Sequence, residues 1–330
     1  MPNRRCVLVT GGAGFVGSHV ALQLAKHGDT VLLLDVIEPG PEAAWLIRDF
    51  RAQVESRMGS VEDPIALRNL CEQHKISHIV HMANIGSDEF IRQNPRAWWG
   101  LQPGGTLNVL EVMRELGLER LVYFSSGAVL TKLQYEPVDA RHPVMLADGG
   151  PAGLYGAGKL AGEALCMAYR EHFDTDFVII RPTSIYGFGM RWPLFVKPMV
   201  ENSVRGEPTR FDHGREYPRD YAHVGDIAQL VERSLDAPVL RDRIFYGSSG
   251  RPLVTAGEAA KAIQEIIPDA DIEIGSGLTD SERSELLSRG VVDMSPAREQ
   301  LGFEPHYDEI TVGLAEYVET YRHYLATRSS

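Results

Sequence analysis

The sequence predicts an α/β fold, a doubly wound parallel sheet with a smaller C-terminal lobe. Short apolar β-branched runs alternate with longer amphipathic stretches through the first half of the chain. A glycine-rich turn follows the first apolar run, and an acidic residue ends the second. With 330 residues the chain has room for about two folding units at ~150 residues each.

Five apolar runs predict strands. Their apolar residues are nearly continuous rather than alternating, which is typical of strands buried on both faces. Strand–helix alternation of this kind favours a parallel sheet with helices on both sides and right-handed connections. The predicted strands are residues 6–10, 30–35, 77–81, 120–125 and 177–180. The predicted helices are residues 14–27, 64–74, 104–116, 153–172 and 224–235.

The pattern changes beyond Arg181. Residues 186–220 hold many Gly, Pro, Arg and aromatic residues with weak periodicity, which predicts loops that contact a ligand. The carboxylates Asp212, Glu216 and Asp220 fall in this stretch and are expected to be solvated. The C-terminal tail has the spacing of one apolar helix face, carried by Ile310, Leu314, Tyr317, Val318 and Tyr321.

Composition and charge narrow the range of partners. Lysine and arginine total 33 and aspartate and glutamate 45, so the net charge is −12. Phosphate backbones and anionic lipids would repel so acidic a chain, and we therefore expect neither a nucleic-acid nor a membrane partner. The 3 cysteines are widely spaced, which predicts free thiols. No signal-peptide core or membrane span is evident, so we expect a cytoplasmic location.

The glycine-rich turn has the sequence Thr10-Gly11-Gly12-Ala13-Gly14-Phe15-Val16-Gly17. Glycines allow the backbone to approach a pyrophosphate, and a helix N-terminus supplies unpaired N–H donors. GxGxxG alone is a weak signal, but here it lies between a strand and a helix, and Asp35 ends the next strand ~20 residues on. The Asp35 carboxylate would accept hydrogen bonds from the adenosine ribose and repel a 2′-phosphate. The pattern predicts a Rossmann-type domain that binds NAD rather than NADP; a turn that only packs a helix on a strand is the alternative.

A second constellation is suited to proton transfer. Tyr155 and Lys159 are four residues apart on one face of a predicted helix, and Ser126 follows a predicted strand. A phenol is a poor base at neutral pH, but a nearby ammonium group favours the phenolate. The three side chains could take a proton from an alcohol while hydride leaves to the cofactor. YxxxK by itself is common on solvated helix faces, so the prediction depends on the nucleotide motif beside it.

With both motifs in view, the chain resembles the extended short-chain dehydrogenase/reductases of the NAD-dependent sugar epimerase/dehydratase family. The resemblance covers nearly the whole length. It rests on residues 10–17, Asp35, His81-Met82-Ala83, Ser125-Ser126, Tyr155 with Lys159, Arg181-Pro182, and residues 219–226.

The resemblance implies roles for individual residues. Residues that would hold NAD are Gly11, Gly14, Phe15, Val16, Asp35, Ser60, Val61, Met82, Ala83 and Pro182, together with Tyr155 and Lys159, which also serve catalysis. Residues that would contact substrate are Ser126, Ser184 and Arg219, the last on a phosphate. A homodimer is also implied, pairing helices 104–116 and 153–172, on which the apolar candidates are Leu107, Leu110, Met113, Leu154, Leu165 and Met167.

The domain boundaries follow from these motifs. We expect an NAD-binding Rossmann domain from residues 1–183 with 224–245. A substrate-binding lobe would come from residues 184–223 with 246–330.

Departures from the family pattern narrow the chemistry. Sugar-nucleotide dehydratases carry an Asp-Glu pair after the catalytic hydroxyl residue, and related decarboxylases carry a Glu, whereas this chain has Gly127-Ala128. Elimination and decarboxylation are therefore disfavoured. Three further positions differ from the residues usual in the family. Ser184 stands where the family has an asparagine, and Gln102-Pro103 stand where it has Asn-Val. Ser60 stands where an aspartate often lies near the adenine. The Arg-x-Gly-Asp that helps grip a nucleotide diphosphate is missing, which weakens the case for a nucleotide-sugar substrate.

Three functions stay open. The first is a (nucleotide-)sugar 4-epimerase that works through a keto intermediate. The second is a simple dehydrogenase of a free sugar, sugar acid or small polyol. The third is a dinucleotide-binding sensor without catalysis, which the Ser126, Tyr155 and Lys159 set disfavours.

Other residues could suggest further sites. No histidine spacing predicts a metal site, and His81 and His223 are expected to form structural hydrogen bonds. Trp98, Trp99 and Trp192 could stack on a base or a sugar, but core or interface aromatics are the favoured interpretation.

Overall fold

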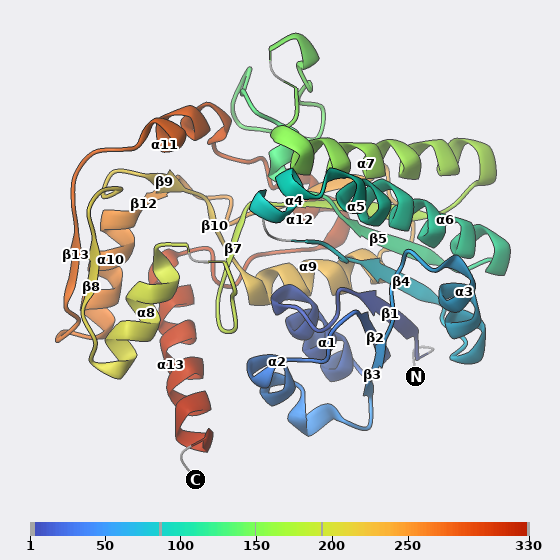
Figure 1. Ribbon diagram of the computed structural model, residues 1–330, viewed down its shortest axis with the longest axis horizontal. Coiled ribbons are helices and arrows are strands. Elements are labelled where there is room, and N and C mark those ends of the chain that lie inside the picture. The colour runs from blue at the N-terminus through green and yellow to red at the C-terminus, as the bar shows by residue number, and fades with distance from the viewer. Residues whose placement is uncertain (1–3, 86–87, 149, 193, 329–330) are drawn as a thin grey trace.

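The computed structural model describes residues 4–85, 88–148, 150–192 and 194–328. It confirms the predicted fold class, because seven parallel strands form one sheet with helices on both faces and a smaller lobe lies to one side (Figure 1). The strand order is β11-β6-β5-β4-β1-β2-β3. These strands are β1 (Cys6–Thr10), β2 (Thr30–Asp35), β3 (Val54–Met58), β4 (His78–His81), β5 (Arg120–Phe124), β6 (Phe177–Pro182) and β11 (Ile244–Gly247).

The strand order reverses next to β1. This strand pairs with β2 on one side and with β4 on the other, so that Thr10 lies between Leu34 and His81. In doubly wound sheets a ligand crevice opens outside the carboxyl ends of the strands at this point. The glycine-rich turn follows β1 directly and therefore lies at the crevice.

Helices cover both faces of the sheet, each over its own apolar cluster. One face carries α1 (Phe15–His27), α9 (Val224–Asp236) and α12 (Ser295–Leu301). The other carries α3 (Pro64–Gln73), α6 (Gly105–Leu116) and α7 (Gly153–Phe173). The central strands are buried throughout, as their continuous apolar runs predict.

The smaller lobe has a third apolar cluster, which includes Tyr186, Phe188 and Tyr317. Its helices are α8 (Val196–Arg205), α10 (Ala256–Ile266), α11 (Asp280–Glu285) and α13 (Ile310–Arg328). Its strands pair as β7 (Ser184–Tyr186) with β10 (Tyr221–His223), β8 (Thr209–Phe211) with β13 (Ile272–Ile274), and β9 (Pro218–Arg219) with β12 (Val254–Thr255). Apolar residues of α12, which lies inside 246–330, pack with the first cluster of the larger domain instead.

Short helices fill the connections. They are α2 (Pro41–Leu46), α4 (Asp88–Gln93), α5 (Pro95–Trp99), the 3₁₀ turns η1 (Arg48–Phe50), η3 (Gly127–Val129), η4 (Leu146–Asp148) and η5 (Leu286–Ser288), and the π-helical η2 (Gly100–Gly104). Among the residues that the structure describes, no helix combines the length and hydropathy needed to span a lipid bilayer.

Three expectations from sequence are corrected. The loop prediction for residues 186–220 is wrong in part, because α8 folds there on the buried Val196, Met199 and Val200. The two edge strands of the sheet, β3 and β11, have no counterpart among the predicted strands; in β3 only Val54 is buried and no apolar run marks it. Asp220 is buried rather than solvated. The cysteines are free thiols, as expected.

Candidate active site

The glycine-rich turn brings β1 close to the end of β4. Gly11 has a φ of +71°, which favours glycine, and a Cβ at this position would lie 2.9 Å from the Ala83 backbone nitrogen. The next helix, α1, begins at the N-cap Gly14, which offers no capping side chain, and no acidic residue lies in its first turn. The first N–H groups of α1 are thus open to an external anion, as a dinucleotide phosphate requires.

The other residues expected around a dinucleotide lie at neighbouring strand ends. Asp35 ends β2, and its carboxylate accepts hydrogen bonds from the backbone N–H groups of Ala13 at 3.1 Å and Val36 at 2.8 Å. Met82 and Ala83 follow β4, where both backbone N–H groups donate to the Thr10 hydroxyl at 3.2 Å. Ser60 and Val61 follow β3, and Pro182 ends β6. The Val61 side chain packs in the core, so only its backbone remains for a ligand.

The predicted proton-transfer side chains meet at the same edge of the sheet. Ser126 follows β5, and its hydroxyl accepts a hydrogen bond from the Ala128 N–H at 3.1 Å. The Ser126 hydroxyl and the Asn84 side chain lie near the Tyr155 phenol, and their hydrogen-bonding groups act to lower its pKa, while burial raises it. The Tyr155 ring stacks on Trp98 with a centroid distance of 5.5 Å, which fixes its orientation.

Lys159 lies one turn further along α7. Its ammonium group donates to the Phe124 carbonyl at 2.9 Å and is buried. Burial lowers the pKa of Lys159 to about 7, and the nearby Glu163 carboxylate opposes this shift. Lys159 is thus held against the end of β5, directly before Ser125 and Ser126.

Glu163 is a residue that sequence reasoning missed, although its position four residues after Lys159 places it on the same helix face. Its carboxylate forms a buried two-point ion pair with Arg181 at 2.8 and 2.7 Å and accepts from the Ser125 hydroxyl. Arg181 also donates to the Tyr246 hydroxyl at 3.2 Å. The network therefore links the lysine helix to Tyr246, which lines the adjoining cavity.

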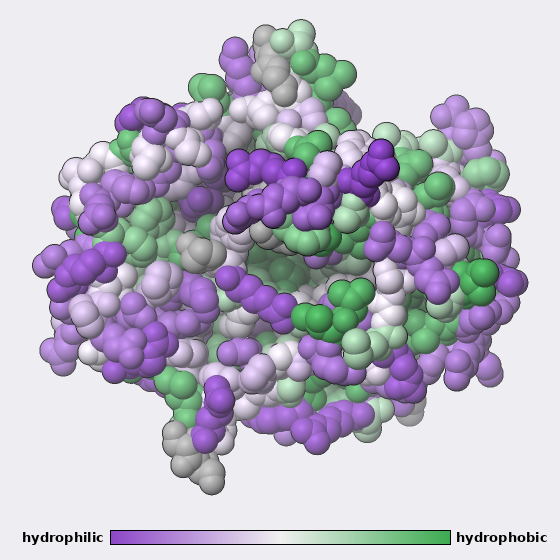
Figure 2. All heavy atoms as spheres, viewed as in Figure 1, coloured by the Kyte–Doolittle hydropathy of each residue, from purple (hydrophilic) through white to green (hydrophobic). Residues whose placement is uncertain are grey.

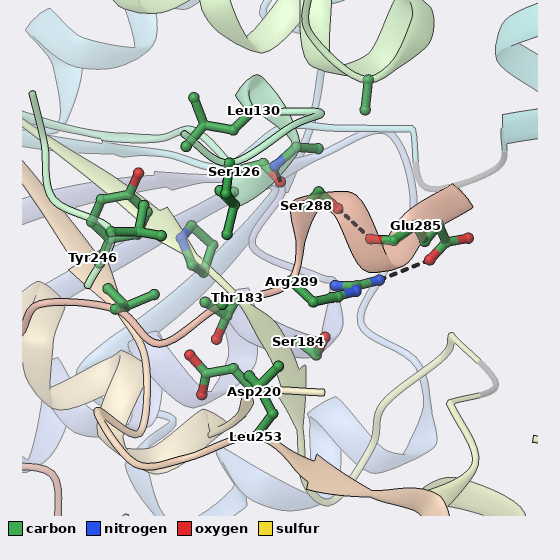
Figure 3. A pocket seen from close by; sticks show the side chains of 18 residues that line it. Ser126, Leu130, Thr183, Ser184, Asp220, Tyr246, Leu253, Glu285, Ser288 and Arg289 are labelled. Carbon is green, nitrogen blue, oxygen red and sulfur yellow. Dashed lines mark hydrogen bonds and ion pairs between the residues drawn. The ribbon is translucent and has the colours of Figure 1, made fainter. Parts of the chain in front are cut away.

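A cavity of about 330 Å³ adjoins Ser126. Figure 3 shows Ser126 and Leu130 on one side of it, with Glu285, Ser288 and Arg289 from α11 and the residues after it on another, and Thr183, Ser184 and Asp220 nearby. The face of the molecule drawn in Figure 2 is hollowed near its centre, with apolar residues at the bottom of the hollow. The cavity side formed by α11 has no signal in the sequence, because these residues come from a segment distant along the chain.

Two arginines lie beside this cavity. Arg219 donates to the Ser184 hydroxyl at 3.3 Å, and its guanidinium carbon lies 4.8 Å from the centre of the Tyr217 ring. Burial and the nearby Arg289 lower the pKa of Arg219. Within the described ranges, Arg219 forms no ion pair with a carboxylate. Such a partly buried cation favours an anionic ligand.

The cavity holds two carboxylates, and both have strong partners. Asp220 accepts from the Ser248 hydroxyl and from the Ser249 hydroxyl at 2.9 Å. Glu285 accepts from the Tyr217 hydroxyl at 2.5 Å and pairs with Arg289 at 2.8 Å. Burial acts to raise the pKa of Glu285, but these hydrogen bonds outweigh it and lower the pKa.

The histidines and tryptophans singled out by sequence have ordinary surroundings. His81 bonds to the hydroxyls of Thr10 at 2.7 Å and Thr106 at 3.2 Å, and burial lowers its pKa to about 3, so it is neutral. His223 pairs with Glu316 at 3.0 Å. Trp98 is a core residue, whereas Trp99 and Trp192 are exposed.

Comparison with known proteins agrees with this geometry. Residues 7–245 match the family described as NAD dependent epimerase/dehydratase family. The putative UDP-glucose 4-epimerase of Methanocaldococcus jannaschii is 27% identical over 319 residues, which cover 92% of this chain and 94% of that protein. The UDP-glucose 4-epimerase of Mus musculus is 32% identical over 249 residues, 68% of this chain and 71% of that one. The solved structure of the Thermus thermophilus UDP-glucose 4-epimerase in complex with NAD is 25% identical, covers 96% of this chain and 99% of its own, and superposes with a TM-score of 0.74.

Proposed function

Because the chain belongs to the NAD dependent epimerase/dehydratase family, we propose that it is a nucleotide-sugar 4-epimerase that works through a keto intermediate. It is an NAD-dependent enzyme of the extended short-chain dehydrogenase/reductase type. The observation that carries the proposal is the proximity of the Ser126 hydroxyl, which lines the cavity, to the Tyr155 phenol, with the Lys159 side chain one helical turn away.

The crevice fits NAD. The open first turn of α1 and the close approach of Gly11 to Ala83 suit a pyrophosphate held by Gly11, Gly14, Phe15 and Val16. Asp35 would bind the adenosine ribose, Ser60 and Val61 would lie near the adenine, and Met82, Ala83 and Pro182 would line the remainder of the cofactor. NAD, when bound, accepts a hydride from the carbon that bears the reacting hydroxyl and returns it.

The chain's own residues move the proton. Tyr155 as phenolate removes the proton from the substrate hydroxyl while its carbon is oxidised to the ketone, and Ser126 holds the same oxygen by a hydrogen bond. Protonated Lys159 stabilises the phenolate electrostatically, and the phenolate in turn raises the pKa of Lys159, so that the two charges form together. When the ketone is reduced on its opposite face, Tyr155 returns the proton to the oxygen, so the configuration at that carbon is inverted and no cofactor is consumed.

Elimination has no suitable acid–base pair here. Gly127 and Ala128 follow Ser126 and carry no ionisable group. The two carboxylates of the cavity, Asp220 and Glu285, are each engaged by at least two hydrogen bonds. These contacts support hydride transfer without dehydration.

Arg219 supports a substrate that carries a diphosphate. It has no carboxylate partner among the described residues, whereas Arg289, which lies near the same Tyr217 ring, is paired with Glu285. Oxygens of a phosphate are strong acceptors for arginine N–H groups. An arginine that is available to a phosphate partly offsets the missing Arg-x-Gly-Asp motif, and it favours a nucleotide sugar over a free sugar as the substrate.

The function is tested with UDP-glucose, UDP-glucuronate and free sugars as separate substrates. We expect the protein, loaded with NAD and freed of excess cofactor, to interconvert the 4-epimers of a UDP-sugar without net NADH formation. Stoichiometric NADH with a free sugar, sugar acid or polyol would identify the dehydrogenase instead. Binding of NAD with no turnover of any of these substrates would favour a sensor.

Asp35 is expected to set the preference for NAD over NADP. Its carboxylate is fixed by two backbone N–H groups, and a 2′-phosphate would bring a second negative charge against it. Replacing Asp35 with serine should narrow the ratio of the two dissociation constants by about tenfold or more, whereas Asp49→Ser, at an exposed carboxylate, should not change it. Calorimetric titration with both cofactors measures the ratio, and tighter wild-type binding of NADP would contradict the argument.

We further propose a homodimer formed through α6 and α7. Of the six candidates, Leu110 and Met113 face the sheet and are buried, Leu154 and Leu165 are half-buried, and Leu107 and Met167 are each 40% exposed. Phe173, which also lies on α7, is 52% exposed. An exposed apolar face on two adjacent helices is typical of an interface. Light scattering should give twice the 36.6 kDa chain mass. The double variant Leu107→Arg/Met167→Arg should be a monomer. The control Val239→Arg, at an exposed position outside α6 and α7, should remain a dimer. A wild-type monomer at micromolar concentration would exclude this interface.

A further inference from the structure

A cation of the smaller lobe reaches the glycine-rich turn. Arg191 lies in the loop between β7 and α8, and its guanidinium donates to the Ala13 carbonyl at 3.2 Å. The same group lies 3.7 Å from where a Cβ on Gly40 would stand, at the start of α2. Arg191 therefore spans the opening between the turn that follows β1 and the segment that follows β2.

The loop that presents Arg191 is anchored on both sides. Phe188 and Met190 are 1% and 2% exposed and pack in the core of the smaller lobe. The Phe188 carbonyl is bonded to His19 of α1 at 2.8 Å, and its ring contacts Trp45 of α2 with a centroid distance of 5.3 Å. The backbone before Arg191 is thus fixed against the nucleotide-binding domain, so the fold places the Arg191 backbone beside the glycine-rich turn.

No carboxylate of the described residues neutralises the charge of Arg191. Over residues 4–85, 88–148, 150–192 and 194–328, its guanidinium makes the single bond to Ala13 and no ion pair with a carboxylate. A guanidinium has five N–H donors, so most of them remain available. The nearest anion-binding feature is the first turn of α1, two to three residues beyond Ala13, which likewise has no internal anionic partner.

We propose that Arg191 is a cofactor-binding residue that pairs with the pyrophosphate of NAD and ties the smaller lobe to it. The inference rests on the proposed binding of NAD. The helix N-terminus would receive the phosphates from the domain side and Arg191 from the opposite lobe, so that the cofactor is held between them. Such a contact slows the loss of NAD, which suits an enzyme that reuses the same cofactor molecule in each turnover.

The test compares wild type with Arg191→Ala, Arg191→Lys and the control Arg241→Ala, an exposed arginine paired with Glu299 on the surface. Loss of a charge-assisted hydrogen bond should weaken NAD binding about 10- to 100-fold in Arg191→Ala and speed its dissociation similarly. Arg191→Lys should restore part of the affinity, because it keeps the charge but not the forked geometry. Arg241→Ala should match wild type.

Two further probes locate the contact. The affinity for ADP should fall with that for NAD in Arg191→Ala, while the affinity for adenosine, which has no phosphate, should not change. If Arg191→Ala and Arg191→Lys bind NAD as tightly as wild type, the residue only bonds the Ala13 carbonyl and the inference is wrong. The inference is also wrong if Arg191→Ala weakens the binding of NADP but not of NAD, since Arg191 would then pair with the 2′-phosphate rather than with the pyrophosphate. Failure of wild type to bind NAD would instead overturn the proposed function.

Discussion

Replacing Tyr155 with phenylalanine should lower the turnover number by about 10²–10⁴-fold, the usual contribution of a positioned acid–base group. The substitution removes only the phenolic oxygen, while the ring can keep its stacking contact with Trp98. Ser126→Ala should cost less, because it removes a hydrogen bond to the same oxygen and no proton carrier. Steady-state kinetics on the UDP-sugar that the wild-type protein turns over measures both effects.

The affinity for NAD separates this chemical role from a structural one. Asp35 and the first turn of α1 remain intact in Tyr155→Phe, so NAD binding should fall far less than turnover. Tyr135→Phe, which removes the hydroxyl of an exposed tyrosine, serves as the control and should leave turnover unchanged. Full activity of Tyr155→Phe would show that the constellation is structural and would remove the main support for the enzyme mechanism.

Lys159→Ala should lower turnover and weaken NAD binding together. Without the ammonium, the pKa of Tyr155 should rise by roughly 1–3 units, so that the phenolate at neutral pH becomes about 10–10³-fold rarer. The part of the pH–rate profile in which the rate rises as Tyr155 ionises should therefore move to higher pH. The family resemblance implies that Lys159 also contacts NAD, so its loss should add a binding defect larger than that of Tyr155→Phe. An unshifted pH profile in Lys159→Ala would contradict the electrostatic role.

Unfolding measurements give a second test of the Lys159 environment. Burial lowers its pKa from 10.5 to about 7 in the folded protein. Below about pH 7 the group is protonated in both states; between about pH 7 and 10.5 only the unfolded chain keeps the proton. Its contribution to the free energy of unfolding therefore rises with pH across that window. The rise should be present in wild type and absent in Lys159→Met, compared by denaturant titration at several pH values.

The sequence by itself determined the parallel sheet and most of the proposed site. Continuous apolar strands, the Gly11-to-Gly17 turn, Asp35 and the four-residue spacing of Tyr155 and Lys159 are local features. Their structure follows from backbone geometry and helical periodicity within a few residues, so each could be located without knowing the rest of the fold. Edge strand β3 escapes such reasoning, because an edge strand with one buried residue leaves no apolar run.

Only the tertiary structure decided what surrounds these residues. Glu285 and Arg289 line the cavity next to Ser126, and Arg191 bonds to Ala13, across separations that no local pattern spans. The buried position of Asp220 likewise depends on serines that come from a later loop. Such contacts are set by how the smaller lobe packs against the carboxyl edge of the sheet. That packing is the sum of many weak, non-directional apolar contacts, which leave no spacing or motif along the chain.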